Sequence, residues 1–250
     1  MQKGLIVLLY NEKANVRELE TKFVERDENY RKFTSSNIQN IAYKYFDPRA
    51  MISLQVKLKE PIVNADAVIT VKIGNDNLMR MIADIKLNIK EVGINKIIVN
   101  IPKNCFVVDV LGKDIDNKWE VDGEDLIVKF NGNKQDNLPI KIILEKDFKV
   151  DAGFEVPIIK IKDSMTWEGV FYLEVNNEIS VSDLKIDNLI QVNARDNEIK
   201  GYVKEENTIF YAYRFISNNY SINFNLAYAQ SKISNNIISY FKVYPDAIIG

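Results

Sequence analysis

Apolar and polar residues alternate through most of the chain. Residues 65–73 and 85–89 follow this pattern, which is typical of strands with one buried face. Turn-forming groups separate such segments, for example Asn75-Asp76-Asn77 and Asp122-Gly123. Short strands with turns at intervals of about ten residues favour a sandwich or barrel over βαβ units. We therefore predict a mainly β protein, made of antiparallel β-sandwich domains with one or two short helices.

The same pattern gives the boundaries of the expected elements. Strands are expected at residues 4–9 (a buried one), 65–73, 78–89, 96–101, 106–111, 119–121, 126–130, 140–144, 153–161 and 169–175, with turns at 91–93, 102–104 and 131–133 and a loop at 112–117. Pro157 makes residues 153–161 an edge strand, because proline cannot donate to a ladder. Short helices are expected after Asn15 and Ser180, since Val16, Leu19 and Phe23 recur at spacings of three and four.

Two stretches of the chain echo two others in the same order. Residues 42–56 resemble residues 212–226 at an offset of 170, and the segment from Gly4 resembles the segment from Gly169 at an offset of 165. An insertion of five residues between the blocks accounts for the difference. This internal similarity predicts that the chain is part of a longer array of repeats.

This array prediction divides the chain into three parts. Residues 1–59 form the C-terminal part of a preceding β-rich repeat, residues 60–165 form a β-sandwich domain, and residues 166–250 form a second β-rich segment that echoes the first. Residues 244–250 are comparable to residues 64–69, so the last segment is expected to end at the start of a possible next unit.

Composition excludes several classes of function. The 250 residues include 33 basic and 35 acidic side chains of interleaved sign, so we expect no nucleic-acid partner. The longest apolar run, residues 5–10, is too short to span a bilayer and lacks the features of a signal peptide. The chain has no histidine, which removes the usual catalytic triads and most zinc or copper sites. We expect no metal site and no cofactor.

The one cysteine and the acidic clusters are the remaining candidates for chemistry. Cys105 has no imidazole to activate it and is expected to be a buried small hydrophobe. Asp114, Asp116, Asp122, Glu124 and Asp125 bracket Trp119, an arrangement that would suit glycoside chemistry or calcium. Interspersed lysines favour solvated loops instead, and we predict no catalytic residue.

Aromatic residues offer a possible binding surface. Trp167-Glu168 precedes Phe171 and Tyr172 and would suit a sugar-stacking platform, although core packing is the simpler interpretation. Aromatic side chains also gather at Phe210, Tyr211, Tyr213, Phe215, Tyr220 and Phe224, matched near residue 42 by Tyr43, Tyr45 and Phe46. Packing between repeats explains this match, so no binding residue is assigned.

One resemblance rests on a series of segments. These are Gly93 to Pro102, Phe106 to Val110, Trp119 to Val121 with Leu126 to Val128, Phe154 to Pro157, Glu168-Gly169 and Ala212 to Phe215. The order resembles β-sandwich segments of large, mostly uncharacterised bacterial exported or envelope-associated proteins. The resemblance implies an extracytoplasmic repeat architecture, at the cell surface or in the periplasm, and transfers no active-site residue.

These observations predict a non-catalytic structural or protein-interaction module of a larger bacterial cell-surface or envelope protein. Its partners would be another protein or neighbouring repeats of the same chain. The first alternative is a carbohydrate-binding module with exposed aromatics near Trp119 or Trp167, for which a glycan would be the ligand. The second is a glycoside hydrolase with a pair of carboxylates about 5–9 Å apart in a cleft.

Overall fold

The computed structural model is mainly β. It describes residues 3–30, 37–150, 153–192, 208–217, 219–229, 242–244 and 247–249, and this part of the chain contains strands, turns and loops but no helix. The strands are β1 (Gly4–Asn11), β2 (Ala14–Lys22), β3 (Val24–Arg26), β4 (Ile38–Tyr45), β5 (Met51–Leu58), β6 (Ile62–Ile73), β7 (Leu78–Asn100), β8 (Phe106–Leu111), β9 (Ile115–Asp122), β10 (Asp125–Asp147), β11 (Gly153–Glu155), β12 (Lys160–Ile161), β13 (Thr166–Asn176), β14 (Ile179–Asp187), β15 (Ile190–Gln191), β16 (Thr208–Phe215), β17 (Ser221–Tyr228), β18 (Lys242–Tyr244) and β19 (Ala247–Ile249).

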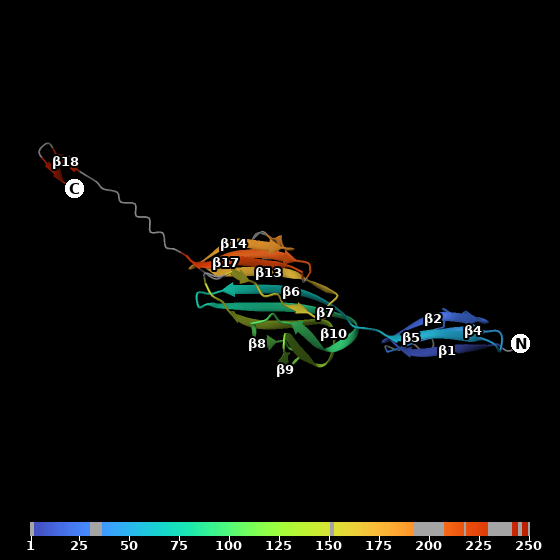
Figure 1. Cartoon of the computed structure of the whole chain (residues 1–250). Helices are drawn as coiled ribbons and strands as arrows, with labels where there is room; N and C mark the ends of the chain where they lie inside the picture. The colour runs from blue at the N-terminus through green and yellow to red at the C-terminus, as the bar shows by residue number, and fades with distance from the viewer. Residues whose placement is uncertain are drawn as a thin grey trace.

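Strands β1 to β5 form a unit of their own, which Figure 1 shows at the N-terminal end of the molecule. They make a three-stranded sheet in the order β1-β4-β3 and a two-stranded sheet, β2-β5. All of these pairs are antiparallel. Residues 3–30 and 37–58 are called the N-terminal unit.

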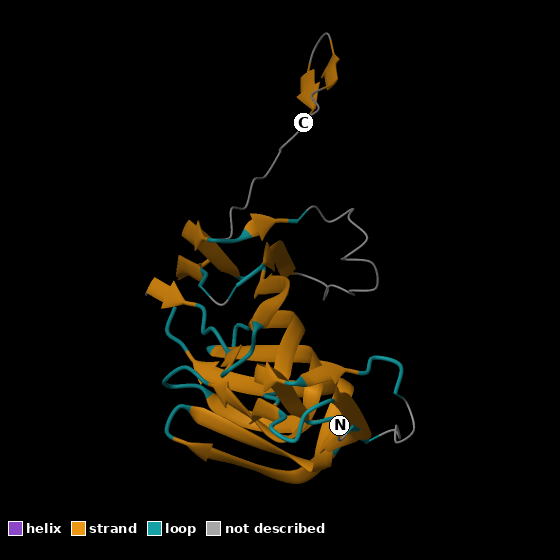
Figure 2. Ribbon diagram, turned by 90° about the vertical axis from the view of Figure 1, so that its right-hand side faces the viewer, coloured by secondary structure: helices purple, strands orange, loops and turns teal. Residues whose placement is uncertain are grey.

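The larger body, from β6 to β17, contains two further sheets (Figures 1 and 2). A nine-stranded sheet has the order β15-β16-β13-β6-β7-β10-β8, with β12 added on β7 and β9 on β10. A three-stranded sheet has the order β11-β17-β14. All pairs are antiparallel except β6 with β13, which run parallel. Strands β18 and β19 form a separate hairpin.

One hydrophobic core unites the two sheets of the larger body. Strand β6 buries every second residue from Val63 to Ile73, while Asp66 and Val68 on its other face are exposed. The buried face of β6 shares its cluster with Phe171 of β13 and Phe224 of β17, so both sheets contribute to the core. Burial of one face only is typical of sheets with a polar outer surface.

The helices expected after Asn15 and Ser180 are absent, and strands β2 and β14 occupy these positions. The ladder of β2 with β5 shifts between Glu18 and Glu20, and the ladder of β14 with β17 shifts between Ser182 and Lys185. Such a bulge inserts a residue and turns a spacing of two into a spacing of three. The apolar spacing that indicated helices is therefore the mark of a bulged strand.

Two expected turns are bends within long strands. Strand β7 continues through residues 91–93, and β10 continues through residues 131–133. Their ladder is irregular between Lys129 and Asp136, and Glu91 and Gly132 have positive φ angles. Because β7 and β10 bend at the same place, residues 91–93 and 131–133 bend the two strands and do not reverse the chain. The loop expected at 112–117 also differs, since β9 begins at Ile115.

Two further expectations need correction. The edge strand expected at residues 153–161 is split at Pro157 into β11, at the edge of the three-stranded sheet, and β12, in the nine-stranded sheet. Proline cannot extend a ladder, so the chain crosses between sheets there. Residues 4–9 do form a strand, but Leu5, Ile6 and Leu9 are exposed rather than buried.

The strand registers of the N-terminal unit recur in the larger body. We compared residue pairs by adding 165 to residue numbers in β1–β3 and 170 to residue numbers in β4–β5. Paired residues of the N-terminal unit then coincide with paired residues of the larger body. Examples are Val7↔Ala42 with Tyr172↔Ala212, Arg26↔Tyr43 with Gln191↔Tyr213, Val16↔Val56 with Val181↔Leu226, and Thr21↔Ile52 with Ile186↔Ile222. The two bulges coincide as well.

Candidate functional site

A groove of about 600 Å³ lies beside Trp119 on the surface of the larger body. Strands β8 and β9 both pair with β10, but with different halves of it, and this leaves the groove between them. Two tight turns form its rim. Asn104 has a φ of 64° in one, and Gly123 has a φ of 62° in the other. Both values lie in the left-handed region that Asn and Gly tolerate best.

The lining of this groove is mostly apolar. Trp119 and Val121 stand two residues apart on β9, and Phe106 begins β8. Phe106 and Val121 are exposed, and Trp119 is half-buried. At the rim, Lys103 Nζ lies 3.5 Å from Glu124 Oε1. An open apolar groove with one ion pair at its rim is suited to binding an apolar or aromatic surface.

Cys105 also lines the groove. Partial burial raises the pKa of its thiol, although Lys146 acts in the opposite direction. The protonated thiol is a poor nucleophile, because the thiolate is the reactive form. Cys105 therefore contributes to the apolar lining, half-buried as a small hydrophobe.

Three of the five acidic residues around Trp119 are paired with lysines, and Glu124 with Lys103 is one of these pairs. Asp114 contacts Lys134, and Asp125 accepts a hydrogen bond from Lys162 Nζ at 2.7 Å. Across the described residues, no group of three or more Asp, Glu or Cys side chains is close enough to hold a metal ion. These carboxylates therefore act as surface ion pairs, each worth little in free energy.

A second hollow, of about 430 Å³, brings together residues that are distant in sequence. Asp66 of β6 lies directly beside Glu168 of β13 in the parallel ladder, and Arg214 of β16 lies opposite Val170 on the far side of β13. All three charged residues line the hollow around Gly169 and are exposed. Two neighbouring carboxylates are the group that the hydrolase alternative requires. The spacing of residues in the sequence does not identify Asp66 and Glu168 as a pair. These two carboxylates become neighbours only because β6 and β13, which are far apart in the chain, lie side by side.

Gly169 permits this parallel contact. It has a φ of 155°, and a Cβ atom placed on it would lie 1.8 Å from the carbonyl oxygen of Ala67. Only a residue without a side chain allows β6 to approach β13 so closely.

Trp167 is not a sugar-stacking platform, because its side chain is only 4% exposed. Its ring lies 5.8 Å from that of Phe215, which in turn stacks on Tyr220 at 5.1 Å. Tyr213, Phe224 and Phe171 belong to the same core. The aromatic concentration at residues 210–224 is thus packing inside the larger body, not packing between repeats as expected.

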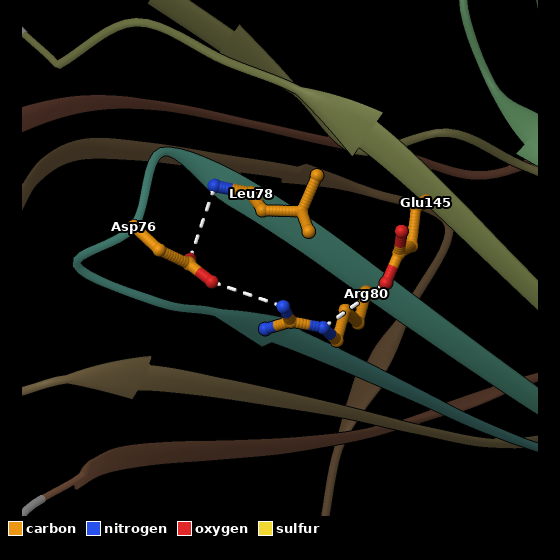
Figure 3. Close-up of polar contacts among 4 residues, drawn as sticks. All are labelled: Asp76, Leu78, Arg80 and Glu145. Atoms are coloured by element: carbon orange, nitrogen blue, oxygen red, sulfur yellow. Dashed lines mark hydrogen bonds and ion pairs between the residues drawn. The ribbon is translucent and has the colours of Figure 1, made fainter.

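A network of charges holds the tip of the β6–β7 hairpin (Figure 3). Arg80 donates from Nη2 to Asp76 Oδ2 at 3.0 Å and from Nε to Glu145 Oε1 at 3.1 Å, while Leu78 N donates to Asp76 Oδ1. Partial burial acts to raise the pKa of Asp76, but these hydrogen bonds and the Arg80 charge outweigh it and lower the pKa. The network ties β7 to β10 and has a structural role.

Comparison with known proteins yields no family. No family model and no curated protein sequence matches the chain. Among solved structures, a two-domain M1 zinc metallopeptidase bound to L-tryptophan matches with 7% identity and a TM-score of 0.43, over 66% of this chain and 42% of its own. An M1 zinc metallopeptidase from Deinococcus radiodurans matches with 9% identity and a TM-score of 0.40, over 67% of this chain and 42% of its own. The chain thus spans less than half of these proteins, and likeness at this level carries no argument about fold or function.

Proposed function

We propose that this chain is a non-catalytic structural or protein-interaction module of a larger bacterial cell-surface or envelope protein. The N-terminal unit and strands β13 to β17 of the larger body are copies of the same part of one repeat, and the larger body is a complete β-sandwich. The observation that carries this proposal is the recurrence of the strand registers at offsets of 165 and 170, with the bulges included. Chance similarity between alternating strands would not reproduce an irregularity at the same place in both ladders.

Local details support the repeat. Phe23 and Asn188 occupy matching positions and have φ angles of 53° and 55°. The turn before β2 is closed by Lys13 N donating to Asn11 Oδ1 at 2.9 Å, and the turn before β14 by Glu178 N donating to Asn176 Oδ1 at 2.9 Å. A left-handed phenylalanine is uncommon, so its match with a residue in the same conformation favours a shared backbone.

The arrangement of the larger body supports its place in an array. Figure 1 shows the chain entering this body at β6 from the side of the N-terminal unit, and β17 ending on the opposite side. Units that enter and leave at opposite ends can follow one another in a row, each contacting its neighbours. The extracytoplasmic location rests on the resemblance to exported bacterial proteins.

A search for turnover tests the non-catalytic part of the proposal. The chain should show no hydrolysis of chromogenic glycosides, esters or peptides above a blank. Asp66→Asn and Glu168→Gln, which remove the two neighbouring carboxylates, should leave any residual signal unchanged. Turnover that disappears in either variant while circular dichroism stays native would favour the hydrolase alternative.

The groove beside Trp119 keeps the carbohydrate-binding alternative open. A glycan array with the intact chain tests it, since an aromatic stacking contact is worth about 0.5–1.5 kcal/mol, or up to about tenfold in affinity. Loss of binding in Trp119→Ala would support a glycan ligand. The control is Leu58→Ala, which changes an exposed apolar residue of the N-terminal unit and should retain binding. The structural proposal expects no glycan to bind.

A further inference from the structure

The N-terminal unit presents a surface whose counterpart in the larger body is covered. This inference rests on the proposed repeat function and deepens it. Ile6 and Phe171 hold matching positions on β1 and β13, yet Ile6 is 39% exposed and Phe171 is 0% exposed. Val56 and Leu226 match on β5 and β17 and are 60% and 1% exposed. By contrast, Leu58 and Tyr228 are exposed in both units, at 81% and 54%.

The covering elements in the larger body are known. Strand β6 pairs in parallel with the open side of β13, with Ile69 directly beside Phe171. Strand β11 pairs with the outer side of β17, from Gly153 to Glu155. Within the described residues, β1 pairs only with β4, and β5 pairs only with β2. The strand edges that carry β6 and β11 in one unit are thus open in the other.

A glycine stands at the matching position of β1 and β13. Gly169 lets Ala67 of β6 come into close contact, and Gly4 holds the matching position on β1. The three atoms nearest to a Cβ built on Gly4 belong to the Tyr45 ring, a side chain, whereas those nearest to a Cβ on Gly169 are backbone atoms of Ala67. Within the described residues, no strand approaches β1 at Gly4 as β6 approaches β13 at Gly169.

We infer that the N-terminal unit is a docking surface for strands donated by a neighbouring repeat, a segment with the strand pattern of residues 62–161. One donated strand adds in parallel to β1 and a shorter one adds antiparallel to β5. Strand addition of this kind gains affinity from main-chain hydrogen bonds and specificity from alternate side chains. Exposed edges and apolar faces together are the features that invite it.

The surface also specifies one side chain of the donor. In the larger body, Lys72 of β6 faces Glu174 of β13, with Nζ 3.8 Å from Oε2. Leu9 holds the position of Glu174 on β1 and is exposed. A lysine beside Leu9 would have no carboxylate to pair with, and its ammonium would lie next to an apolar side chain. The donor strand that fits β1 therefore carries an apolar residue where β6 carries Lys72.

A peptide with the sequence of residues 62–73 is the probe, added to the full 250-residue chain. Hydrogen exchange followed by NMR should slow about tenfold or more at alternate amides of β1, those that do not donate to β4. A second peptide carrying Lys72→Leu should bind about threefold or more tightly than the first. A peptide carrying Ile69→Asp should not bind.

Two variants of the chain complete the test. Ile6→Lys places a charge where the donor's Ile69 must pack and should weaken binding at least about tenfold, without destabilising the already exposed site. Leu58→Lys adds the same charge to the same unit outside the surface and should bind the peptide unchanged.

The inference is overturned if neither peptide slows exchange in β1, or if both variants weaken binding equally. Protection of β1 that rises with chain concentration in the absence of peptide would assign the surface to a second copy instead of a repeat. None of these results would alter the strand registers on which the proposed function stands, so the two failures are distinguishable.

Discussion

Replacing Gly169 with alanine should weaken the larger body more than any other glycine-to-alanine change in a described strand. The added Cβ atom would lie 1.8 Å from the Ala67 oxygen, far inside the 3.4 Å at which ordinary contact begins. The obstacle is backbone in the middle of the β6–β13 ladder, so no side chain can rotate away. The φ angle of 155° is also unfavourable for any residue with a side chain.

Two costs add in this variant. Forcing an extra carbon into a packed site costs about 1–3 kcal/mol, and a residue held in a sparsely populated backbone region costs about 1–3 kcal/mol. We expect a loss of about 3 kcal/mol in the free energy of unfolding. For a unit of this size, such a loss lowers the Tm by about 6–12 °C.

Urea and thermal unfolding, followed by near-ultraviolet circular dichroism, measure this loss. Gly153→Ala is the matched control, because its Cβ atom would meet only Asn225 Oδ1 at 3.6 Å, an ordinary contact. It should change stability by less than about 1 kcal/mol. Equal stability of the two variants would refute the close parallel approach of β6 and β13.

Three other predictions concern the core, the N-terminal unit and the groove. Leu87→Ala, at a fully buried position of β7, should cost about 2–5 kcal/mol in urea unfolding, whereas Val68→Ala on the exposed face of β6 should cost less than about 1 kcal/mol. Burial and the hydrogen bond to Glu18 raise the pKa of Tyr43 to about 12, so the fold favours the neutral phenol. This stabilisation is complete below about pH 10 and is lost as the pH rises towards about 12. In Tyr43→Phe, the free energy of unfolding should no longer fall between these two pH values because of this residue. Trp119→Ala should leave the Tm within about 3 °C of the wild type, since a half-buried groove residue supports little of the core, and calorimetry checks this.

Local signals in the sequence predicted much of the fold. The mainly β class followed from alternation, and the turns at Asn75–Asn77 and Asp122–Gly123 lie where the chain reverses between β6 and β7 and between β9 and β10. These features depend on neighbouring residues, whose backbone preferences act in any context.

The errors arose where tertiary pairing decides the outcome. A bulge between Glu18 and Glu20 imitates helical spacing, and no property of residues 14–22 alone separates the two structures. The turn-forming residues in β7 and β10 bend these strands and do not reverse the chain, because the two strands pair with each other along most of their length.

The candidate sites were less accessible to sequence reasoning. Trp119 was singled out, but its groove depends on β8 and β9 pairing with different halves of β10. The neighbouring carboxylates of Asp66 and Glu168 are about a hundred residues apart and meet only through a parallel ladder, for which a sequence offers no register signal.

The central claim is that the N-terminal unit and the last strands of the larger body share one backbone arrangement. Cross-strand nuclear Overhauser effects in solution test it directly. We predict Hα or amide contacts between Thr21 and Ile52 and equivalent contacts between Ile186 and Ile222, in the same register. Contacts between residues three apart within residues 15–23, in place of the contact between Thr21 and Ile52, would show a helix there and contradict the claim.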